Sequence, residues 1–358
     1  MSETTAHPAG YRAQPGPHAP AGPHVPSGPH GAVAGSAPAA TEIAGPARLH
    51  PGTEPHAPWV WVNGGFVRSE DLRAHYFSHA LHYGTGVFEG IRAYETTRGT
   101  AAIFRLQDHM ERLAASARFY RMELPYRPAE LCAAAVETVR RNGFSNCYVR
   151  PLAFFGEGPI HLTPNRGCPT EVLIAARYYG AYLGTDGLAH GVPVTVSSWR
   201  KFDRSMLPPT VKGCGHYTNS VLAAQEAEAR GAAEAILLNV DGTVAEGTGE
   251  NIFFVKDGVL STNDEASNIL PGITRDTVLT LARDLGIPTA IRAFRLEDLY
   301  GADEIFMTGT AAEVTPVASI DGRPIGRLEG GLALRLQKAY FDCVRGRDLR
   351  YARWLSHV

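Results

Sequence analysis

A lysine in the second half of the chain has neighbours suited to chemistry. Of the four lysines in the sequence, Lys212 stands among small residues, within 211–215. Small neighbours leave room for a flat ligand, so the amine of Lys212 could form a Schiff base with a carbonyl compound. A lysine in a loop is more often merely exposed, so both interpretations of Lys212 remain open at this point.

A glycine-rich segment that follows contains two acidic residues with unusual neighbours. Glu246 and Glu250 are four residues apart, and a predicted buried strand begins directly after them at 251. Acidic side chains between glycines and a buried strand are poorly explained as solvated surface residues. A simple turn role for Glu246 is the alternative.

The composition limits the classes of protein that fit. The chain has 358 residues, 44% of them hydrophobic, with a formal net charge of -2. This length allows one large or two medium domains, and the charge gives no indication of a nucleic-acid partner. No apolar run approaches the roughly 20 residues that span a bilayer, and a secretory signal is not expected. Five cysteines without a C-x-x-C pair predict a reducing cytoplasm, with no disulfide framework and no metal site.

Residues 1–56 differ in composition from the rest of the chain. They are rich in Pro, Ala, Gly and His, and Gly-Pro-His recurs at 16–18, 22–24 and 28–30. Such a segment buries too little apolar surface to offset the entropy of ordering, so we predict a disordered tail. Weak metal binding by the spaced histidines is the alternative.

The elements that must position the lysine and the glutamates form two predicted domains. Residues 57–180 predict a small α/β domain, 181–190 a linker, and 191–358 a large domain. Asn63-Gly64, Asp241-Gly242 and Asp257-Gly258 predict tight hairpin turns. Hairpins that alternate with helices favour largely antiparallel or mixed sheets in an α/β (α+β) protein, and no dinucleotide or P-loop motif is present. The expected helices are 106–120, 129–141, 217–230, 274–285 and 330–345, and the expected strands are 59–62, 66–67, 147–155, 171–176, 192–199, 234–240, 251–256 and 304–308.

Five ordered motifs in this chain resemble the branched-chain aminotransferases, which are class IV, fold-type IV enzymes that use pyridoxal 5'-phosphate. The resemblance runs from about 58 to 345. It implies a two-domain fold, transfer of amino groups between branched-chain L-amino acids and 2-oxoglutarate, and a place in branched-chain amino-acid biosynthesis. The motifs are His82–Arg92, Tyr148–Pro151, Glu246–Asn251, Leu270–Arg275 and Thr308–Pro316.

The resemblance implies a role for each residue that matches a cofactor-binding position. Lys212 matches the lysine that holds the cofactor covalently and moves the proton, and Glu246 matches the acid that pairs with the pyridine nitrogen. The other matching residues are Arg112 for the phosphate, Tyr217 for the phenolic oxygen, Leu270 against the ring, and Ile273, Thr274 and Thr310 as the phosphate cradle. For Thr274 the sequence agrees independently, because Gly272-Ile273-Thr274 precedes a predicted helix whose N-terminus would bind an anion. Thr274 is expected as the N-cap or a first-turn residue.

Substrate-binding positions also follow from the resemblance. Tyr83, Phe88 and Tyr182 match walls of an apolar side-chain pocket, and Gly90 matches a position that leaves space within it. Thr310 and Ala311 match the turn that binds the substrate α-carboxylate. Tyr148 and Arg150 match the pair that handles carboxylates, and a structural pairing of Arg150 with Glu89 is the alternative. The family further implies a homodimer or higher homo-oligomer, in which the loop 156–163 closes the pocket of the partner subunit.

Three positions depart from the family pattern and leave the substrate range open. His216 replaces a common asparagine, Cys214 stands two residues from Lys212, and the loop 156–163 lacks the usual glycine-rich form. Cys214 is expected to be a small buried hydrophobe, with a redox-sensitive thiol as the alternative. Other functions considered are a transaminase for a non-proteinogenic aliphatic amino acid, a D-amino-acid aminotransferase, an aminodeoxychorismate lyase and a scaffold without cofactor.

Overall fold

Two β-sheets with helices on their faces make up the part of the chain described by the computed structural model, which is residues 57–326 and 329–358. The predicted tail and its histidines lie outside these described residues. Contacts group the described residues into one compact unit, and the expected division at 181–190 remains a prediction. No helix in the described part of the chain is both long and apolar enough to cross a membrane.

The first sheet has eight strands within the described residues, all of them antiparallel to their neighbours. The Asn63-Gly64 turn between its first two strands has positive φ at both residues, as the predicted hairpin turn requires. The last strand comes from the C-terminus of the chain and pairs with β5, far from it in sequence. The strands are β1 Trp59–Val62, β2 Gly65–Arg68, β3 Gly86–Phe88, β4 Ile91–Glu95, β5 Ala101–Phe104, β6 Cys147–Phe155, β7 Thr170–Arg177 and β17 Leu355–His357.

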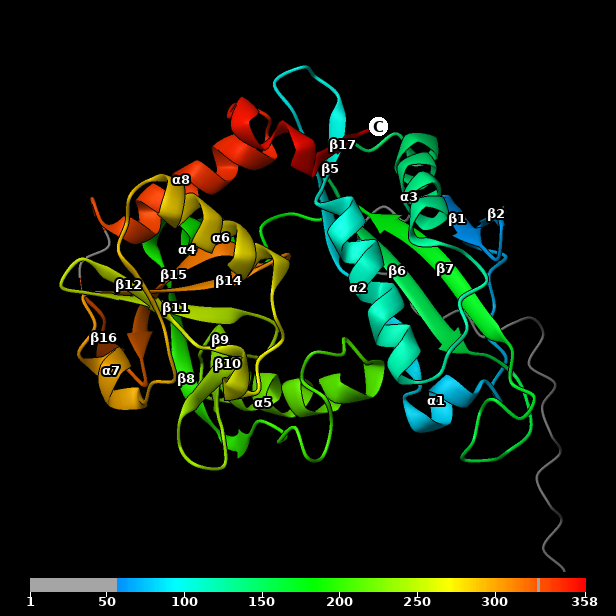
Figure 1. The fold of residues 1–358 in the computed structure, drawn as a ribbon, viewed down its shortest axis with the longest axis horizontal. Coiled ribbons are helices and arrows are strands. Elements are labelled where there is room, and N and C mark those ends of the chain that lie inside the picture. The colour runs from blue at the N-terminus through cyan, green and yellow to red at the C-terminus, as the bar shows by residue number, and fades with distance from the viewer. Residues whose placement is uncertain (1–56, 327–328) are drawn as a thin grey trace, which may run out of the picture. The chain divides into compact units, whose positions relative to one another are not determined.

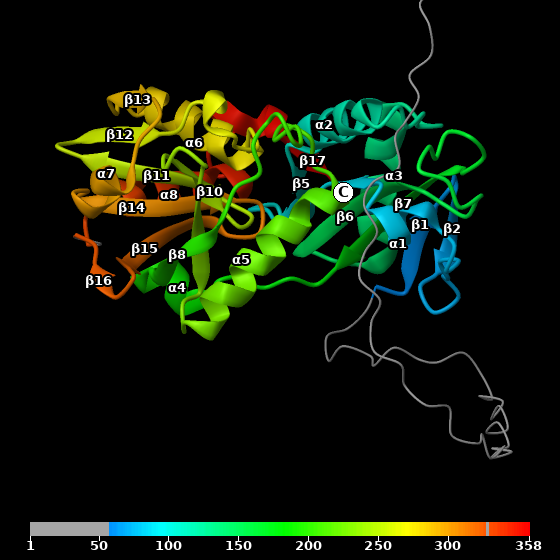
Figure 2. The same cartoon turned by 90° about the horizontal axis from the view of Figure 1, so that it is seen from below.

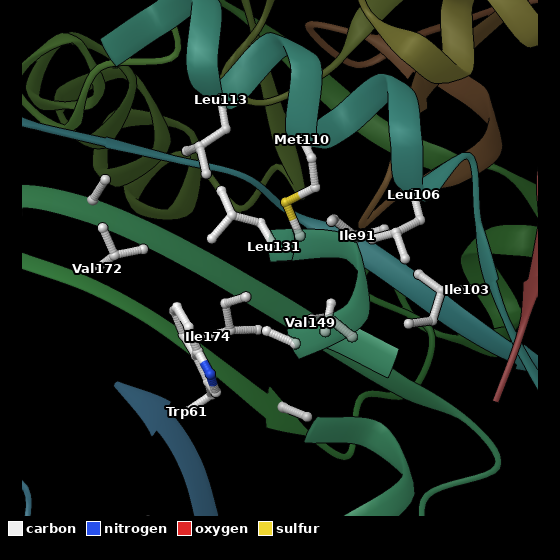
Figure 3. Packing of buried hydrophobic residues seen from close by; sticks show 14 of the residues in the cluster. Trp61, Ile91, Ile103, Leu106, Met110, Leu113, Leu131, Val149, Val172 and Ile174 are labelled. Carbon is white, nitrogen blue, oxygen red and sulfur yellow. The ribbon is translucent and has the colours of Figure 1, made fainter. Parts of the chain in front are cut away.

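Helices α2 (Leu106–Phe119) and α3 (Pro128–Asn142) lie on the same side of β6 and β7 (Figure 1, Figure 2). Leu106, Met110 and Leu113 of α2 point toward the sheet (Figure 3), and all three are buried in the same core cluster as Ile91 and Ile103. Apolar residues spaced by three and four fall on one face of a helix, which is why this helix could be predicted from its sequence. The short helix α1 (His79–Tyr83) precedes β3.

The second sheet has nine strands in the same described part of the chain and is mixed. Strand β8 runs parallel to both of its neighbours, β9 and β15, while most other pairs are antiparallel. The predicted turns at Asp241-Gly242 and Asp257-Gly258 both join antiparallel strands. These findings confirm the expected α/β (α+β) class with antiparallel and mixed sheets. The strands are β8 Val192–Arg200, β9 Glu234–Leu238, β10 Val244–Gly247, β11 Asn251–Lys256, β12 Val259–Thr262, β13 Thr289–Ile291, β14 Glu304–Gly309, β15 Glu313–Ile320 and β16 Arg323–Pro324.

Alternating side chains of β11 enter two different cores. Phe253 packs with residues of α6 and α8, whereas Ile252 and Phe254 pack with Leu299 of α7 on the other side. Both faces of the strand are therefore covered, because successive side chains of a strand point to opposite faces. The helices of this part are α4 Thr185–His190, α5 Tyr217–Ala229, α6 Ile273–Asp284, α7 Leu296–Tyr300 and α8 Leu332–Val344. Helix α4 occupies the last six residues of the expected linker.

Candidate active site

A cavity of about 330 Å³ is lined by elements of both sheets. Its walls come from β3 and β6, from the segment before α5, from the start of α6, and from the β10–β11 and β14–β15 connections. The structure brings together segments that are up to about two hundred residues apart. All predicted site residues except Tyr83 line the cavity: Phe88, Gly90, Arg112, Tyr148, Arg150, Tyr182, Lys212, Tyr217, Glu246, Leu270, Ile273, Thr274, Thr310 and Ala311.

Lys212 lies in the irregular segment between β8 and α5. Its backbone is fixed from two sides, because its N–H donates to Ser116 Oγ at 3.1 Å and its carbonyl accepts from the N–H of Phe88 at 3.1 Å. In the cavity, Lys212 Nζ donates to the hydroxyl of Tyr217 at 2.5 Å. Burial lowers the pKa of Lys212, and the positive charge of Arg112 lowers it further. A lowered pKa favours the neutral amine, which is the nucleophilic form.

Glu246 is buried and contacts neighbours through both carboxylate oxygens. One oxygen lies 2.7 Å from Lys201 Nζ, and the other accepts from Asn251 Nδ2 at 3.1 Å and from the N–H of Leu270 at 3.0 Å. Burial raises the pKa of Tyr217, and the negative charge of Glu246 raises it further. The Glu246 carboxyl group is therefore fixed in position at the cavity, and the hydroxyl of Tyr217 stays protonated beside it.

Arg112 is held in a charged cluster behind the cavity. Its guanidinium makes two hydrogen bonds to Glu89, at 2.7 and 2.9 Å, and a third to the carbonyl of Pro271 at 3.0 Å. His109 Nδ1 lies 2.6 Å from the same carboxylate. Burial would raise the pKa of Glu89, but Arg112 and His109 outweigh burial and hold this pKa well below the ordinary carboxyl range. The bidentate pair orients the arginine at the cavity wall.

The start of α6 forms another wall of the cavity. The helix begins at Ile273 with Gly272 as its N-cap, so Thr274 is a first-turn residue. The first turn of a helix offers backbone N–H groups to an anion. Gly272 is required by close packing, because an added Cβ would lie 2.1 Å from Asn251 Oδ1. Thr308 Oγ1 on the neighbouring strand is buried and finds no hydrogen-bond partner among the residues that the structure describes.

The opposite wall carries the residues predicted for substrate. Arg150 Nη2 donates to the hydroxyl of Tyr148 at 3.3 Å, and its guanidinium lies 4.6 Å from the centre of the Phe88 ring. Glu89 is occupied by Arg112 and His109, so the alternative pairing of Arg150 with Glu89 is not what the structure contains. An added Cβ at Gly90 would lie 1.7 Å from the Tyr148 hydroxyl. The space that Gly90 leaves is therefore occupied by Tyr148.

Tyr83 is not among the described residues that line the cavity of its own chain. It lies at the end of α1, where its side chain is exposed and its ring contacts His79 at 4.5 Å. The loop after β6 contacts α1, because His79 Nε2 lies within hydrogen-bond distance, 2.8 Å, of the carbonyl oxygen of His161. Several large apolar side chains around α1 and this loop are exposed: Tyr76, Phe77, Leu81, Ile160 and Leu162.

Two of the three departures from the family pattern have a clear structural setting. Cys214 Sγ packs against Gly86, where an added Cβ would lie only 2.9 Å away, and burial raises the pKa of the thiol. A raised pKa disfavours the reactive thiolate, which supports the expectation of a small hydrophobe. His216 is buried against the Phe202 ring with Nε2 3.3 Å from the Tyr120 hydroxyl, and burial lowers its pKa.

Several cavity residues received no role from the sequence, and four of them have notable contacts or burial. Lys201 and Asn251 both contact Glu246, Tyr179 lies beside Tyr148, and Glu250 is buried at the cavity. Burial raises the pKa of Glu250 well above its usual range, and the nearby Glu234 raises it further. The spacing of Glu246 and Glu250 already indicated burial, but nothing in the sequence indicated their partners.

These features define a class of protein. The model of the amino-transferase class IV family matches residues 86–320, which include the lysine, the acid, the helix N-terminus and both cavity turns. The chain therefore belongs to the class IV aminotransferases, as the motifs predicted.

Curated and solved relatives narrow the comparison. The branched-chain-amino-acid aminotransferase of Escherichia coli K12 is 44% identical over 307 residues, which cover 86% of this chain and 99% of the relative. The crystal structure of the T.th. branched-chain amino acid aminotransferase with pyridoxamine 5'-phosphate has a TM-score of 0.81 at 50% identity, covering 84% of this chain and 98% of that chain. The structure of the same enzyme complexed with N-(5'-phosphopyridoxyl)-L-glutamate has a TM-score of 0.79 at 48% identity, and the match again covers 84% of this chain and 98% of that chain.

Proposed function

We propose that this chain transfers amino groups between the branched-chain L-amino acids leucine, isoleucine and valine and 2-oxoglutarate, using pyridoxal 5'-phosphate. The observation that carries the proposal is the arrangement at one cavity of Lys212 Nζ, the Tyr217 hydroxyl and the Glu246 carboxylate. This arrangement occurs in a chain that is 44–50% identical to branched-chain aminotransferases over most of their length.

The residues of the cavity fit a flat cofactor that carries a phosphate. An amine with a lowered pKa is available on one wall, and a buried carboxylate lies on another. The first turn of α6 suits the phosphate, with Arg112 beside it and the hydroxyl of Thr308, unpartnered among the described residues, nearby in the lining. Leu270 offers an apolar surface for a ring. The donor set therefore matches the chemistry of pyridoxal phosphate.

When bound, the cofactor supplies the ring that withdraws electrons from the substrate α-carbon. Lys212 would hold the cofactor covalently through Nζ, and the same amine would move the proton at the substrate α-carbon. Glu246 would keep a proton on the ring nitrogen, because an adjacent negative charge favours the protonated form. Tyr217 would donate a hydrogen bond to the phenolic oxygen.

The substrate is held by a different set of residues. The amides of the turn at Thr310 and Ala311 bind the α-carboxylate, which orients the α-carbon toward Lys212. Phe88 and Tyr182 exclude water from a branched aliphatic side chain. Arg150 and Tyr148 at the edge accept the second carboxylate of glutamate, for which a guanidinium is well suited. One pocket can thus accept both substrates, because the aliphatic side chain and the second carboxylate of glutamate contact different residues.

We further propose that the active unit is a homodimer in the cytoplasm. Exposed apolar side chains around α1 and the loop after β6 support a subunit contact, because such patches mark interfaces. Tyr83 would then reach the cavity of the partner subunit, in agreement with its absence from the described lining of the cavity in its own chain. Five free cysteines support a reducing compartment.

The decisive experiment combines activity with trapping. Purified protein is assayed with leucine, isoleucine, valine and glutamate as donors, and with D-leucine and aminodeoxychorismate as controls. Borohydride reduction followed by peptide mapping should place the cofactor on Lys212. The Lys256→Ala variant is the matched control, since Lys256 is an exposed lysine paired with Asp303 and should leave the trapped product unchanged. Turnover of D-leucine but not L-leucine would contradict the proposal.

A further inference from the structure

Arg92 is a buried arginine outside the cavity lining that the described residues form. It lies on β4 with 7% of its surface exposed, and its guanidinium contacts two segments that do form the cavity. One is the turn between β14 and β15, and the other is the segment after β7. A buried guanidinium must be paired and hydrogen-bonded to offset the cost of its desolvation. Moving any of its partners away would therefore cost free energy, which keeps these partners in place.

The first partner segment carries the proposed α-carboxylate site. Arg92 Nη1 donates to the carbonyl of Ala311 at 3.2 Å and lies 3.2 Å from Glu313 Oε2. Glu313 has a φ of 58°, in the left-handed region that costs a non-glycine residue free energy. Burial raises the pKa of Glu313, while the charge of Arg92 opposes that shift. The ion pair between Arg92 and Glu313 therefore holds the turn at the residue whose backbone conformation is strained.

The second partner segment carries aromatic residues of the substrate wall. Arg92 Nη2 donates to the carbonyls of Tyr179 and Gly180, at 3.1 and 2.6 Å. The Tyr179 ring lies 4.9 Å from Tyr148 and 6.4 Å from Tyr182, centre to centre. The position of the Tyr179 ring beside Tyr148 and Tyr182 thus depends on a backbone that Arg92 holds. The guanidinium joins this wall directly to the turn at Ala311.

A layer of tyrosines behind the guanidinium leaves it little freedom to move. The Arg92 guanidinium lies 5.7 Å from the centre of the Tyr94 ring, and the hydroxyls of Tyr94 and Tyr340 are 3.1 Å apart. Both tyrosines are buried. A planar guanidinium between aromatic faces and oxygen acceptors is held in one geometry, which a lysine ammonium could not reproduce.

We propose that Arg92 is a positioning residue for the substrate α-carboxylate, because it holds the Thr310–Ala312 turn in a fixed relation to the Tyr179–Gly180 segment. This inference rests on the proposed function, which assigns the α-carboxylate to the turn. Arg92 does not touch the substrate. It acts through the backbone of Ala311 and through Tyr179, so its loss should affect carboxylate binding more than cofactor binding or fold.

The test uses holoenzyme with Arg92→Lys, which keeps a charge for Glu313 but loses the forked donors. Titration calorimetry with 4-methylvaleric acid, a carboxylate with the side chain of leucine and no amino group, measures the subsite without turnover. We expect its Kd to rise about 10- to 100-fold, the scale of a displaced binding group. The Kd of pyridoxal phosphate and the melting temperature should stay near the wild-type values. KM for leucine should rise more than kcat falls.

The matched control is Arg230→Lys. Arg230 also combines an ion pair, to Glu226, with a backbone hydrogen bond, to the carbonyl of Val196, but it is not among the described residues of the cavity lining. Its Kd for the acid should equal that of wild type. Hydrogen exchange gives a second readout, in which peptides over 178–184 and 310–313 should exchange faster in Arg92→Lys, while 270–276 should not change.

A folded Arg92→Lys enzyme with unchanged Kd for the acid would overturn the inference while the proposed function stands. Equal weakening of the acid and of the cofactor would also overturn it, since Arg92 would then be structural. Wild-type holoenzyme that does not bind the acid at all would overturn both. If Arg92→Lys does not fold, Glu313→Gln replaces it, because this variant keeps the shape and removes only the charge; a several-fold rise in Kd supports the inference, and no rise overturns it.

Discussion

The side of the cavity that we propose for the cofactor and the side that we propose for the substrate are built differently. On the cofactor side, Glu246 and Glu89 are buried and each carries several short contacts within the chain. On the substrate side, Arg150 and Tyr182 are exposed, and Arg150 donates a long hydrogen bond of 3.3 Å to a tyrosine. The buried charges of Glu246 and Glu89 are thus paired within the chain, without a ligand. The polar groups of Arg150 and Tyr182 are exposed to solvent.

This difference has a physical reason. A charge that is buried permanently must be paired, because desolvation otherwise costs several kcal/mol. A resident cofactor can be served by such a rigid arrangement. A pocket that accepts both an aliphatic and an acidic side chain needs a charge that one substrate engages and the other leaves in water. Changes on the cofactor side should therefore have large, general effects, and changes at the rim should have smaller, selective ones.

Removal of the lysine amine should have the largest effect. Lys212→Ala eliminates both the covalent attachment and the proton transfer, so we expect a loss of at least about 10⁴-fold in kcat with the fold retained. Turnover number and circular dichroism test this together. Substantial activity in the variant would assign the chemistry to a different lysine.

Glu89→Gln should destabilise the fold by about 3–5 kcal/mol, because Arg112 would remain buried without its carboxylate. The pKa of Glu89 is lowered from 4.5 in the folded state, so its contribution is present above that value and declines as the pH falls below it. Urea unfolding should therefore give a difference between wild type and variant that is constant near pH 7 and shrinks below pH 4.5. A constant difference at all pH values would indicate a packing effect.

Glu246→Gln should weaken catalysis by about 10²- to 10³-fold, the scale of a lost electrostatic contact in an active site. Cofactor affinity should change much less, since the phosphate contacts remain. The contact with Lys201 adds a further expectation, because an uncompensated Lys201 should lower the melting temperature. Single-turnover rates, cofactor Kd and thermal melts separate these effects, and equal losses of rate and affinity would argue against the role at the ring nitrogen.

At the rim, Arg150→Met should slow the half-reaction with glutamate by about 10- to 100-fold, the usual scale of a hydrogen bond to a charged group. The half-reaction with leucine should change much less, because leucine offers the guanidinium no partner. Stopped-flow absorbance follows the two half-reactions separately. A parallel loss in both would identify Arg150 as structural and would erase the distinction between the two sides.

The smallest effect is expected from removal of residues 1–55. The E. coli relative is matched over 99% of its own length by 86% of this chain. Activity and melting temperature of the shortened protein should equal those of the full chain. A drop in either would show that this segment contributes to the folded body.

Local patterns explain which elements could be predicted. Helix α2 and the Asn-Gly and Asp-Gly turns were predicted from patterns that span about seven residues or fewer, and all were found in the structure. Strands β3, β4 and β5 were not predicted, since each is short and buried on both faces, which removes the alternation that marks a strand. Pairing of β17 with β5 joins residues about 250 apart, which no local pattern can indicate.

The sequence by itself determined the family and singled out Lys212 and Glu246 as the candidates for the cofactor lysine and its acid, because covalent chemistry demands particular residue types at fixed places in a motif. Tertiary structure decided which side chains surround them. Lys201 reaches Glu246 from the end of β8, and Arg92 reaches Ala311 from more than two hundred residues away. Such contacts form because a buried charge must find its partner wherever folding brings one within hydrogen-bond distance, and sequence separation does not enter that requirement.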